Sequence, residues 1–377
     1  MTDFLPSQID SLILILGFGI AASIASLAAA PLLISFLRRY GIARKSAGDK
    51  TMELESRQGK AQTPIMGGLL VILTVLVFTY LWNWDRQFTW VPIGVLFIAA
   101  LLGAIDDLLN VFGGIRRQRS LAQTMTLIRV HKLWYVKLWL IVTLPWTLFK
   151  RMTTVLGSKQ RTGVLVHEKL ILQFAAGAVS AWWIYYKLGE AWRDIYIPFH
   201  GYESIGILII PLIILIVMFT ANAVNVSDGM DGLAGGMLIP TFGALAFMAW
   251  IYGFDALAIL NAVTAGSLVS YTYFNIKPAR FQMGDVGSLG LGALLAINAL
   301  AVNSMAILPF IAFMFYAEAI TVMIQAIGRH IFGRRVFRMA PLHHHLELCG
   351  WSEEKTIMRL WVIHFGFVLL GVWIGLH

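Results

Sequence analysis

The chain has 377 residues, of which 58% are hydrophobic and 13% are charged, and its mean hydropathy is +0.75. These values exclude a soluble globular domain and indicate a polytopic membrane protein. Its single cysteine, Cys349, excludes an internal disulfide and a cysteine-rich metal site. The net charge of +9 does not favour nucleic-acid binding, because the basic residues lie in loops between apolar runs, where orientation signals and anionic lipids account for them.

Ten apolar runs are long enough to cross a hydrocarbon core, which takes about 20 helical residues. They lie near 11–37, 66–82, 91–109, 170–188, 206–224, 234–252, 256–274, 286–303, 305–327 and 356–376. The sequence therefore predicts an all-α protein with ten transmembrane helices in a single integral membrane domain over residues 1–377. No Lys or Arg precedes Arg38, so we expect the first run to be a retained helix and not a cleaved signal peptide.

The loops alternate sharply in basic content. Of the 29 lysines and arginines, 26 lie in the segments 38–65, 106–169, 276–285 and 328–359. The loops on the other side of the membrane contain the remaining three, Arg86, Lys187 and Arg193. By the positive-inside rule the four basic segments are cytoplasmic and both termini are periplasmic.

The run from Trp134 to Phe149 is ambiguous. It has 16 residues, contains Lys137 and is interrupted by Pro145, so it is short for a span. A single crossing here would move every later loop to the other side and abolish the basic asymmetry. We therefore expect one interfacial or re-entrant helix within a cytoplasmic-side insertion, 114–162, and a long periplasmic excursion is the alternative.

Acidic residues occur where apolar runs meet polar segments: the adjacent Asp106 and Asp107, then Asp228 and Asp231, then Asp285. Charge at a bilayer boundary is costly, so we expect these carboxylates to serve chemistry. The predicted topology places them all on the cytoplasmic side, where they can converge. Carboxylates at a membrane boundary suit Mg²⁺, which is commonly held by one or two carboxylates together with substrate phosphates.

The segment from Asn222 to Gly236, NAVNVSDGMDGLAGG, alternates Asn and Asp with Gly. Glycines let the backbone approach a phosphate closely, whereas the simpler alternative is a tight loop in which Asp228 caps the next helix. Asn225, Asp228 and Asp231 recur every three residues, so on a helical turn they would share a face. This spacing favours a binding site.

Three consecutive histidines, His343, His344 and His345, follow the sequence MAPL. They could form a solvated polar loop or a zinc site. Their spacing differs from the i, i+4 arrangement of a helical zinc motif. A position near a pyrophosphate is the interpretation that fits the acidic clusters.

Five motifs together resemble the phospho-N-acetylmuramoyl-pentapeptide transferase family, within the superfamily of polyprenyl-phosphate N-acetylhexosamine-1-phosphate transferases. They are KAQTPIMGG from Lys60, DD at Asp106, NAVNVSDGMDGLAGG from Asn222, QMGDVGSLGLG from Gln282 and MAPLHHHLELCGW from Met339. The resemblance runs in order from about Lys60 to the C-terminus and skips the 114–162 insertion.

The resemblance implies transfer of phospho-N-acetylmuramoyl-pentapeptide from UDP to undecaprenyl phosphate, with Mg²⁺, to give lipid I and UMP in peptidoglycan synthesis. It implies a transferase of the bacterial inner membrane with its active site on the cytoplasmic side. The expected partners are UDP-N-acetylmuramoyl-pentapeptide, undecaprenyl phosphate and membrane lipids, with no nucleic acid. The resemblance also suggests a homodimer.

Site residues carried over by motif follow the same resemblance. Asp285 is the expected Mg²⁺ ligand, Asp107 would assist at the metal or at the lipid phosphate, and Asp106 would accept the proton of the lipid phosphate or orient it. The fourth expected catalytic residue is His343. The expected substrate-binding residues are Lys60, Asn225, Asp228, Asp231, Phe281, Gln325, His344 and His345. We expect direct attack by the lipid phosphate over an aspartyl-phosphate intermediate, because that phosphate is already negatively charged at neutral pH.

The sequence departs from the family pattern at three places. Asn110 stands where the family usually has Lys, and Arg116 or Arg117 could replace that charge. Gln282 stands where an aromatic residue is expected, with Phe281 one position earlier. The third departure is the insertion, which a typical family member lacks.

Two other functions fit parts of the pattern. A sister transferase that uses UDP-N-acetylglucosamine would keep the Asp motifs. An ion-coupled transporter would also contain intramembrane carboxylates, but it would place them near the bilayer midplane and show repeat symmetry.

Overall fold

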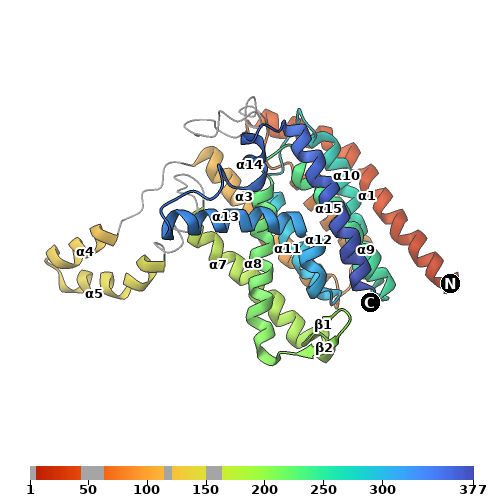
Figure 1. Ribbon diagram of the computed structural model, residues 1–377, viewed down its shortest axis with the longest axis horizontal. Coiled ribbons are helices and arrows are strands. Elements are labelled where there is room, and N and C mark those ends of the chain that lie inside the picture. Colours follow the sequence, from red (N-terminus) through yellow and green to blue (C-terminus); the bar gives the residue numbers. More distant parts are fainter. Residues whose placement is uncertain (1–5, 44–62, 114–120, 150–163) are drawn as a thin grey trace.

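The structure is a computed structural model that describes residues 6–43, 63–113, 121–149 and 164–377. It consists mostly of long helices, with one small β-hairpin (Figure 1). The helices are α1 (Pro6–Arg39), α2 (Leu69–Trp82), α3 (Trp90–Phe112), α4 (Leu121–Val130), α5 (Trp134–Val142), α7 (Val166–Trp183), α8 (Ile209–Ser227), α9 (Leu233–Ile251), α10 (Asp255–Asn275), α11 (Gly284–Ala301), α12 (Leu308–Ile311), α13 (Phe313–Ile331), α14 (Leu342–Leu348) and α15 (Glu353–Gly375). Short helical turns occupy Ile184–Leu188, Glu190–Trp192, Gly206–Leu208 and Met305–Ile307.

Within the described residues, 7 helices are long and apolar enough to cross a membrane: α1, α3, the helix that includes α8, α9, α10, α11 and α15. The bent pair α12 and α13 makes up to 8. The remaining two of the ten predicted runs also form helices, but α2 has only 14 residues and α7 is not among the candidate spans. The chain is therefore a largely helical, polytopic membrane protein.

Two features of the fold were absent from the sequence prediction. Strands β1 (Asp194–Ile197) and β2 (Gly201–Ser204) pair antiparallel, with Asp194 opposite Ser204, and add one small hairpin to a mostly helical fold that is consistent with the all-α prediction. The apolar run 305–327 is not one straight helix, because the chain bends by 82° between α12 and α13. At the break, Ala312 has φ −114° and ψ 20°, outside the helical region. Hydropathy could not reveal this bend, since both halves are apolar.

Helix α11 lies at the centre of the bundle. In its 18-residue apolar stretch 89% of the residues are buried, compared with 17% in α1. Small residues allow its neighbours to approach: a Cβ on Gly290 would lie 3.2 Å from Ala100 Cβ on α3, and a Cβ on Gly292 would lie 2.7 Å from Ala221 Cα on α8. Close approach at small residues is typical of helix packing in membranes, where apolar burial between helices gives little driving force.

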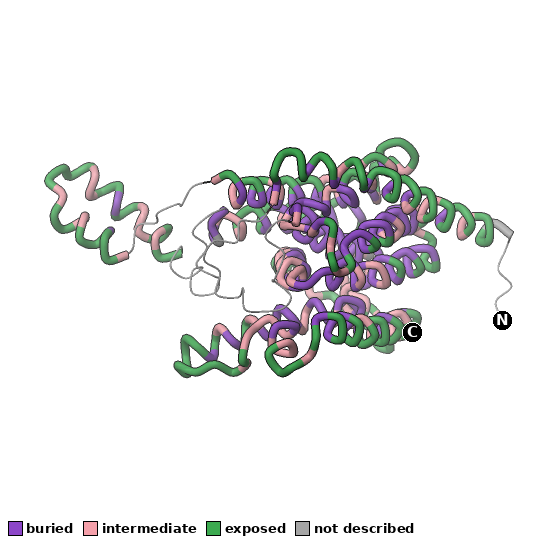
Figure 2. Tube along the Cα trace, turned by 90° about the horizontal axis from the view of Figure 1, so that it is seen from above, coloured by how far each residue is buried: buried purple, intermediate pink, exposed green. Residues whose placement is uncertain are grey.

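The described part of the insertion forms a pair of short helices, α4 and α5, that projects from the bundle (Figure 1). Figure 2 shows that most of this pair is exposed. The predicted single helix 134–149 is wrong in detail: α5 ends at Val142, a turn follows at Thr143, and residues 144–149 are helical again. Pro145 explains the interruption, because it has no N–H to donate to a preceding helical carbonyl.

Candidate active site

The predicted acidic residues meet where the C-terminal part of α3 crosses the start of α11. Gly103 of α3 lies against the backbone of Asp285, and a Cβ on Gly103 would overlap the Asp285 carbonyl. Asp106 and Asp107 follow within one turn and are both buried. A larger residue at position 103 would separate the helices, so this glycine sets the distance between the Asp pair and Asp285.

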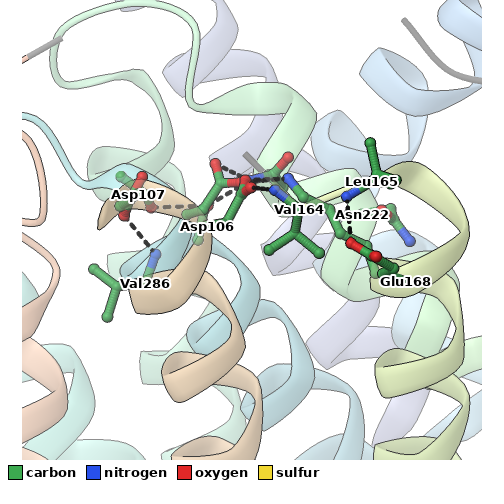
Figure 3. Close-up of polar contacts among 12 residues, drawn as sticks. Asp106, Asp107, Val164, Leu165, Glu168, Asn222 and Val286 are labelled. Atoms are coloured by element: carbon green, nitrogen blue, oxygen red, sulfur yellow. Dashed lines mark hydrogen bonds and ion pairs between the residues drawn. The ribbon is translucent and has the colours of Figure 1, made fainter. Parts of the chain in front are cut away.

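Asp106 and Asp285 share one lysine. The Asp106 Oδ2 and Asp285 Oδ2 atoms lie 2.5 Å and 2.6 Å from Lys169 Nζ, at the start of α7. Asp106 Oδ1 accepts a hydrogen bond of 2.5 Å from the backbone N–H of Val164 (Figure 3). Both oxygens of Asp106 are therefore occupied, one by a neutral donor and one by an ammonium group.

Asp107 points to the other side of the same junction. Its Oδ2 accepts a hydrogen bond of 3.0 Å from the backbone N–H of Val286, in the first turn of α11 (Figure 3). Gly284 has φ +73°, and a Cβ there would lie 2.6 Å from the Asp107 carboxylate. A glycine is required at this position both for its backbone conformation and for the close approach.

Asn225 links α8 to this cluster. Its Nδ2 donates to Asp285 Oδ1 at 3.0 Å and to Ser288 Oγ at 2.8 Å. One turn earlier, Asn222 and Gln173 exchange two side-chain hydrogen bonds, of 2.7 Å and 3.3 Å, that connect α8 to α7. These amides fix α7, and with it Lys169, relative to α8.

The threonine-proline-glycine motif lies against the loop that precedes Asp285. The N–H groups of Gly67 and Gly68 donate to the carbonyls of Gln282 and Met283 at 2.7 Å and 2.9 Å, and Gln282 N–H donates to Pro64 at 2.8 Å. Two of the five sequence motifs are thus joined by backbone hydrogen bonds. Lys60 lies outside the described residues.

Phe281 is completely buried. Its ring packs edge-on against Tyr271 with centroids 5.2 Å apart, and a Cβ on Gly67 would overlap it. A uracil base could stack on Phe281 only after this ring moved out of the core.

The spacing of Asn225, Asp228 and Asp231 predicted that they share a helical face. The structure shows that they do not. Helix α8 ends at Ser227, Asp228 is its C-terminal cap residue, and Asp231 lies in the turn before α9. The Oδ2 atom of Asp231 accepts a hydrogen bond of 3.3 Å from Ala279 N–H. The simpler alternative for Asp228 also differs from the structure, because α9 begins after Gly232, at φ +84°, without a side-chain cap.

His343 is fully buried beside a carboxylate that the sequence analysis missed. Its backbone N–H donates to Glu318 Oε1 at 3.2 Å, and its Nδ1 lies 3.1 Å from Glu318 Oε2. Its Nε2 faces the turn after Asp228, since a Cβ on Gly229 would overlap that nitrogen. Glu318 therefore holds the imidazole from one side and Gly229 leaves room for it on the other.

The other two histidines face different partners. His344 Nδ1 lies 3.4 Å from Glu347 Oε2, and His345 Nδ1 accepts a hydrogen bond of 3.3 Å from the backbone N–H of Arg338. His344 is buried, and His345 packs against the ring of Phe337.

Gln325 is engaged with backbone atoms. Its Nε2 donates to Phe337 O at 3.0 Å, and its Oε1 accepts from Val336 and Phe337 N–H at 3.0 Å and 2.9 Å. In this arrangement its amide holds the loop that leads to the histidines.

The acidic cluster has the donor atoms that a divalent cation needs. Its donors are carboxylate oxygens, which suit Mg²⁺. When Asp106, Asp107 and Asp285 are all ionised, their three negative charges against the one positive charge of Lys169 leave a formal charge that a divalent cation would balance. Among the described residues, no group of three or more His, Cys, Asp or Glu side chains is arranged as a metal site. The residues fit the cation in donor type and charge, and Lys169 occupies the position between two of them.

Known proteins are similar to this chain over most of its length. The model of glycosyl transferase family 4 matches residues 161–303. A phospho-N-acetylmuramoyl-pentapeptide-transferase from Chloroflexus aurantiacus is 33% identical over 353 residues, which cover 91% of this chain and 84% of the relative. Proteins of the same name from Geobacillus sp. strain WCH70 and Shouchella clausii are 31% and 32% identical, over 97% and 96% of this chain and 98% and 96% of the relatives.

The chain belongs to the phospho-N-acetylmuramoyl-pentapeptide-transferase family. The family resemblance read from the five motifs is therefore confirmed, and with it a transferase of peptidoglycan synthesis. In this family member the structure adds Lys169 and Glu318 to the residues named from sequence. Lys169 and Glu318 each lie within or beside an apolar run. A charged residue at such a position was the sequence feature that could have identified them as site residues.

Proposed function

We propose that this protein transfers phospho-N-acetylmuramoyl-pentapeptide from its UDP carrier to undecaprenyl phosphate, releasing UMP and forming lipid I. Family membership over nearly the whole chain supports the reaction. The observation that carries the site is the convergence of Asp106, Asp107, Asp285 and Lys169 at helix ends. One substrate is water-soluble and the other is anchored in lipid, so their phosphates can meet only near the headgroup boundary.

In the proposed reaction an oxygen of the lipid phosphate attacks the phosphorus that carries the sugar. A new P–O bond forms to the lipid, and the bond to UMP breaks. Asp106 is held by Val164 N–H and Lys169, so it is fixed to orient the lipid phosphate or to take its proton. Lys169, which has two carboxylate partners, can turn one of its donors to a diphosphate oxygen.

Asp107 and Asp285 are the proposed Mg²⁺ ligands. The ion, when bound, would offset the charge of the diphosphate and polarise the phosphorus under attack. Asn225 keeps Asp285 in place through Oδ1. We propose that Asp228, Asp231 and the three histidines bind the nucleotide, diphosphate or sugar from the adjoining turn and α14, with Lys60 and Gln325 beside them.

The proposed topology has ten spans, both termini periplasmic and the site on the cytoplasmic side of the inner membrane. The start of α1 and the end of α15 lie at the lower side of Figure 1 with β1 and β2, and α14 lies at the upper side. This arrangement agrees with termini on the face opposite the histidines. The whole chain is proposed as one domain with the insertion 114–162 on the cytoplasmic side, and the homodimer stays a prediction.

A purified-protein assay tests the function. UMP release should require Mg²⁺, undecaprenyl phosphate and UDP-N-acetylmuramoyl-pentapeptide together. Asp285→Asn should lower the rate by about 10²-fold or more, since charge placed for phosphoryl transfer contributes several kcal/mol. Asp255→Asn is the matched control, because Asp255 is exposed in the first turn of α10 and pairs with none of these residues in the structure. Wild-type activity in Asp285→Asn would remove the metal assignment.

The sister activity is tested in the same assay. UDP-N-acetylglucosamine in place of the muramoyl substrate should release no UMP above background.

The transporter alternative loses support from the position of the carboxylates, because Asp106 and Asp285 lie near the ends of α3 and α11 and not at their middles.

A further inference from the structure

The helix pair α4 and α5 projects from the bundle (Figures 1 and 2), and many of its exposed side chains are apolar or aromatic. Trp134, Trp139 and Val142 are 74%, 60% and 69% exposed. Leu140 of α5 is buried, so α5 has a packed side as well as an exposed apolar side. An exposed patch of this kind marks an interaction surface.

The charges of the insertion are all of one sign. Its sequence, 114–162, contains ten Lys and Arg and no Asp or Glu. These residues are Arg116, Arg117, Arg119, Arg129, Lys132, Lys137, Lys150, Arg151, Lys159 and Arg161. Three of them, Arg129, Lys132 and Lys137, lie in or between α4 and α5, within a few residues of Trp134 and Trp139 in the sequence.

This combination fits one partner. Tryptophan is enriched at the boundary between hydrocarbon and headgroups, and clustered Lys and Arg are attracted to anionic headgroups. An acidic soluble protein would match the charge but would leave Trp134, Trp139 and Val142 without an apolar phase. We propose that α4 and α5 dock on the surface of an anionic phospholipid bilayer.

The docking surface is connected to the candidate active site. Trp146, which follows α5, packs edge-on against His167 at the start of α7, with ring centroids 5.3 Å apart. His167 lies between Val164 and Lys169, the two residues that contact Asp106. Lipid docking of the insertion would therefore hold the segment that carries Lys169, a consequence that rests on the proposed function.

The first experiment measures docking without substrate. An environment-sensitive dye is attached at Leu138→Cys in a Cys349→Ser background, and the full chain is placed in bilayer nanodiscs of phosphatidylcholine with or without phosphatidylglycerol. We expect a blue-shifted emission, quenched by brominated lipid, that requires phosphatidylglycerol. A dye at Tyr202→Cys, on β2, is the control and should not respond.

Charge variants complete the test. Arg129→Gln/Lys132→Gln/Lys137→Gln should raise severalfold the fraction of phosphatidylglycerol needed for half of the emission shift. The control variant Arg86→Gln/Lys187→Gln changes residues predicted to lie on the other side of the membrane. It should leave the required fraction of phosphatidylglycerol unchanged. An equal shift in phosphatidylcholine alone, or no shift in either lipid, would overturn the proposal. Because no turnover is measured, this result is independent of whether the enzyme assay succeeds.

Discussion

Lys169 is the residue whose role follows most directly from its contacts. Its ammonium is the only cationic partner that the structure shows for the buried Asp106 carboxylate among the described residues, and it also contacts Asp285. From the sequence alone, Lys169 is only one of the basic residues of the segment 106–169, because its approach to Asp106 and Asp285 depends on α3, α7 and α11 packing together. Pairings of this kind join residues far apart in the chain and leave no local spacing to read.

Replacing Lys169 should therefore affect activity strongly. Lys169→Met leaves two carboxylates without their shared cation, and we expect a loss of about 10²-fold or more in UMP release. Lys169→Arg keeps the charge but changes its geometry, so it should retain more activity than Lys169→Met. Lys187→Met, an exposed lysine near the end of α7, serves as the control. Equal rates for Lys169→Met and the control would show that this lysine is dispensable.

Glu318 is the second residue that only the structure reveals. A carboxylate inside the apolar run 305–327 was a usable signal, since such residues rarely occur there without a partner. The partner is His343, 25 positions along the chain. The backbone N–H and Nδ1 of His343 both face Glu318, so we interpret Glu318 as a positioning residue.

Disturbing His343 from either side tests this interpretation. Glu318→Gln weakens the contact to Nδ1, and Gly229→Ala places a methyl group against Nε2. Each should lower activity by about tenfold or more, and His343→Ala combined with either change should lose no more than His343→Ala alone. Measured UMP release by the single and double variants decides the matter: additive losses would mean that Glu318 and Gly229 act independently of His343.

At the scale of the elements, the sequence predicted where helices form but not how they meet. All ten predicted apolar runs form helices. The bend at Ala312, the short α2 and the β-hairpin were not predicted, because hydropathy reports burial in an apolar phase and carries no information on direction. The closeness of α3 and α11 was not predicted either, although their glycines were visible in the sequence.

Gly103 offers a direct test of that closeness. Gly103→Val would place side-chain atoms on the Asp285 backbone, and we expect a loss of stability of about 1–3 kcal/mol together with loss of UMP release. Gly94→Val, on the same helix, is a matched control because no atom lies within 4 Å of a Cβ at that position. Thermal unfolding in detergent and the activity assay should separate the two variants. Similar behaviour of both would show that α3 tolerates displacement from α11.

At the scale of the whole molecule, the candidate site depends on topology. Three acidic clusters and the histidines were predicted to converge because basic loops placed them on one side, and the structure brings Asp106, Asp107, Asp285 and Asn225 together. The predicted side of the membrane for each loop could not show which side chains are in contact. Backbone hydrogen bonds also join residues 64–68 to 282–283, although these segments are far apart in the sequence.

The side of the membrane on which this face lies can be measured by labelling the native cysteine of the chain. Cys349, the single cysteine of the chain, is exposed just after α14. Because the loop that contains it is predicted to be cytoplasmic, a membrane-impermeant maleimide should label Cys349 only after the membrane is permeabilised. In a Cys349→Ser background, Tyr202→Cys on β2 should react in intact cells or spheroplasts, since β2 lies at the opposite side of the molecule (Figure 1). Labelling of Cys349 from outside would reverse the topology and place Asp106 and Asp285 away from any cytoplasmic nucleotide.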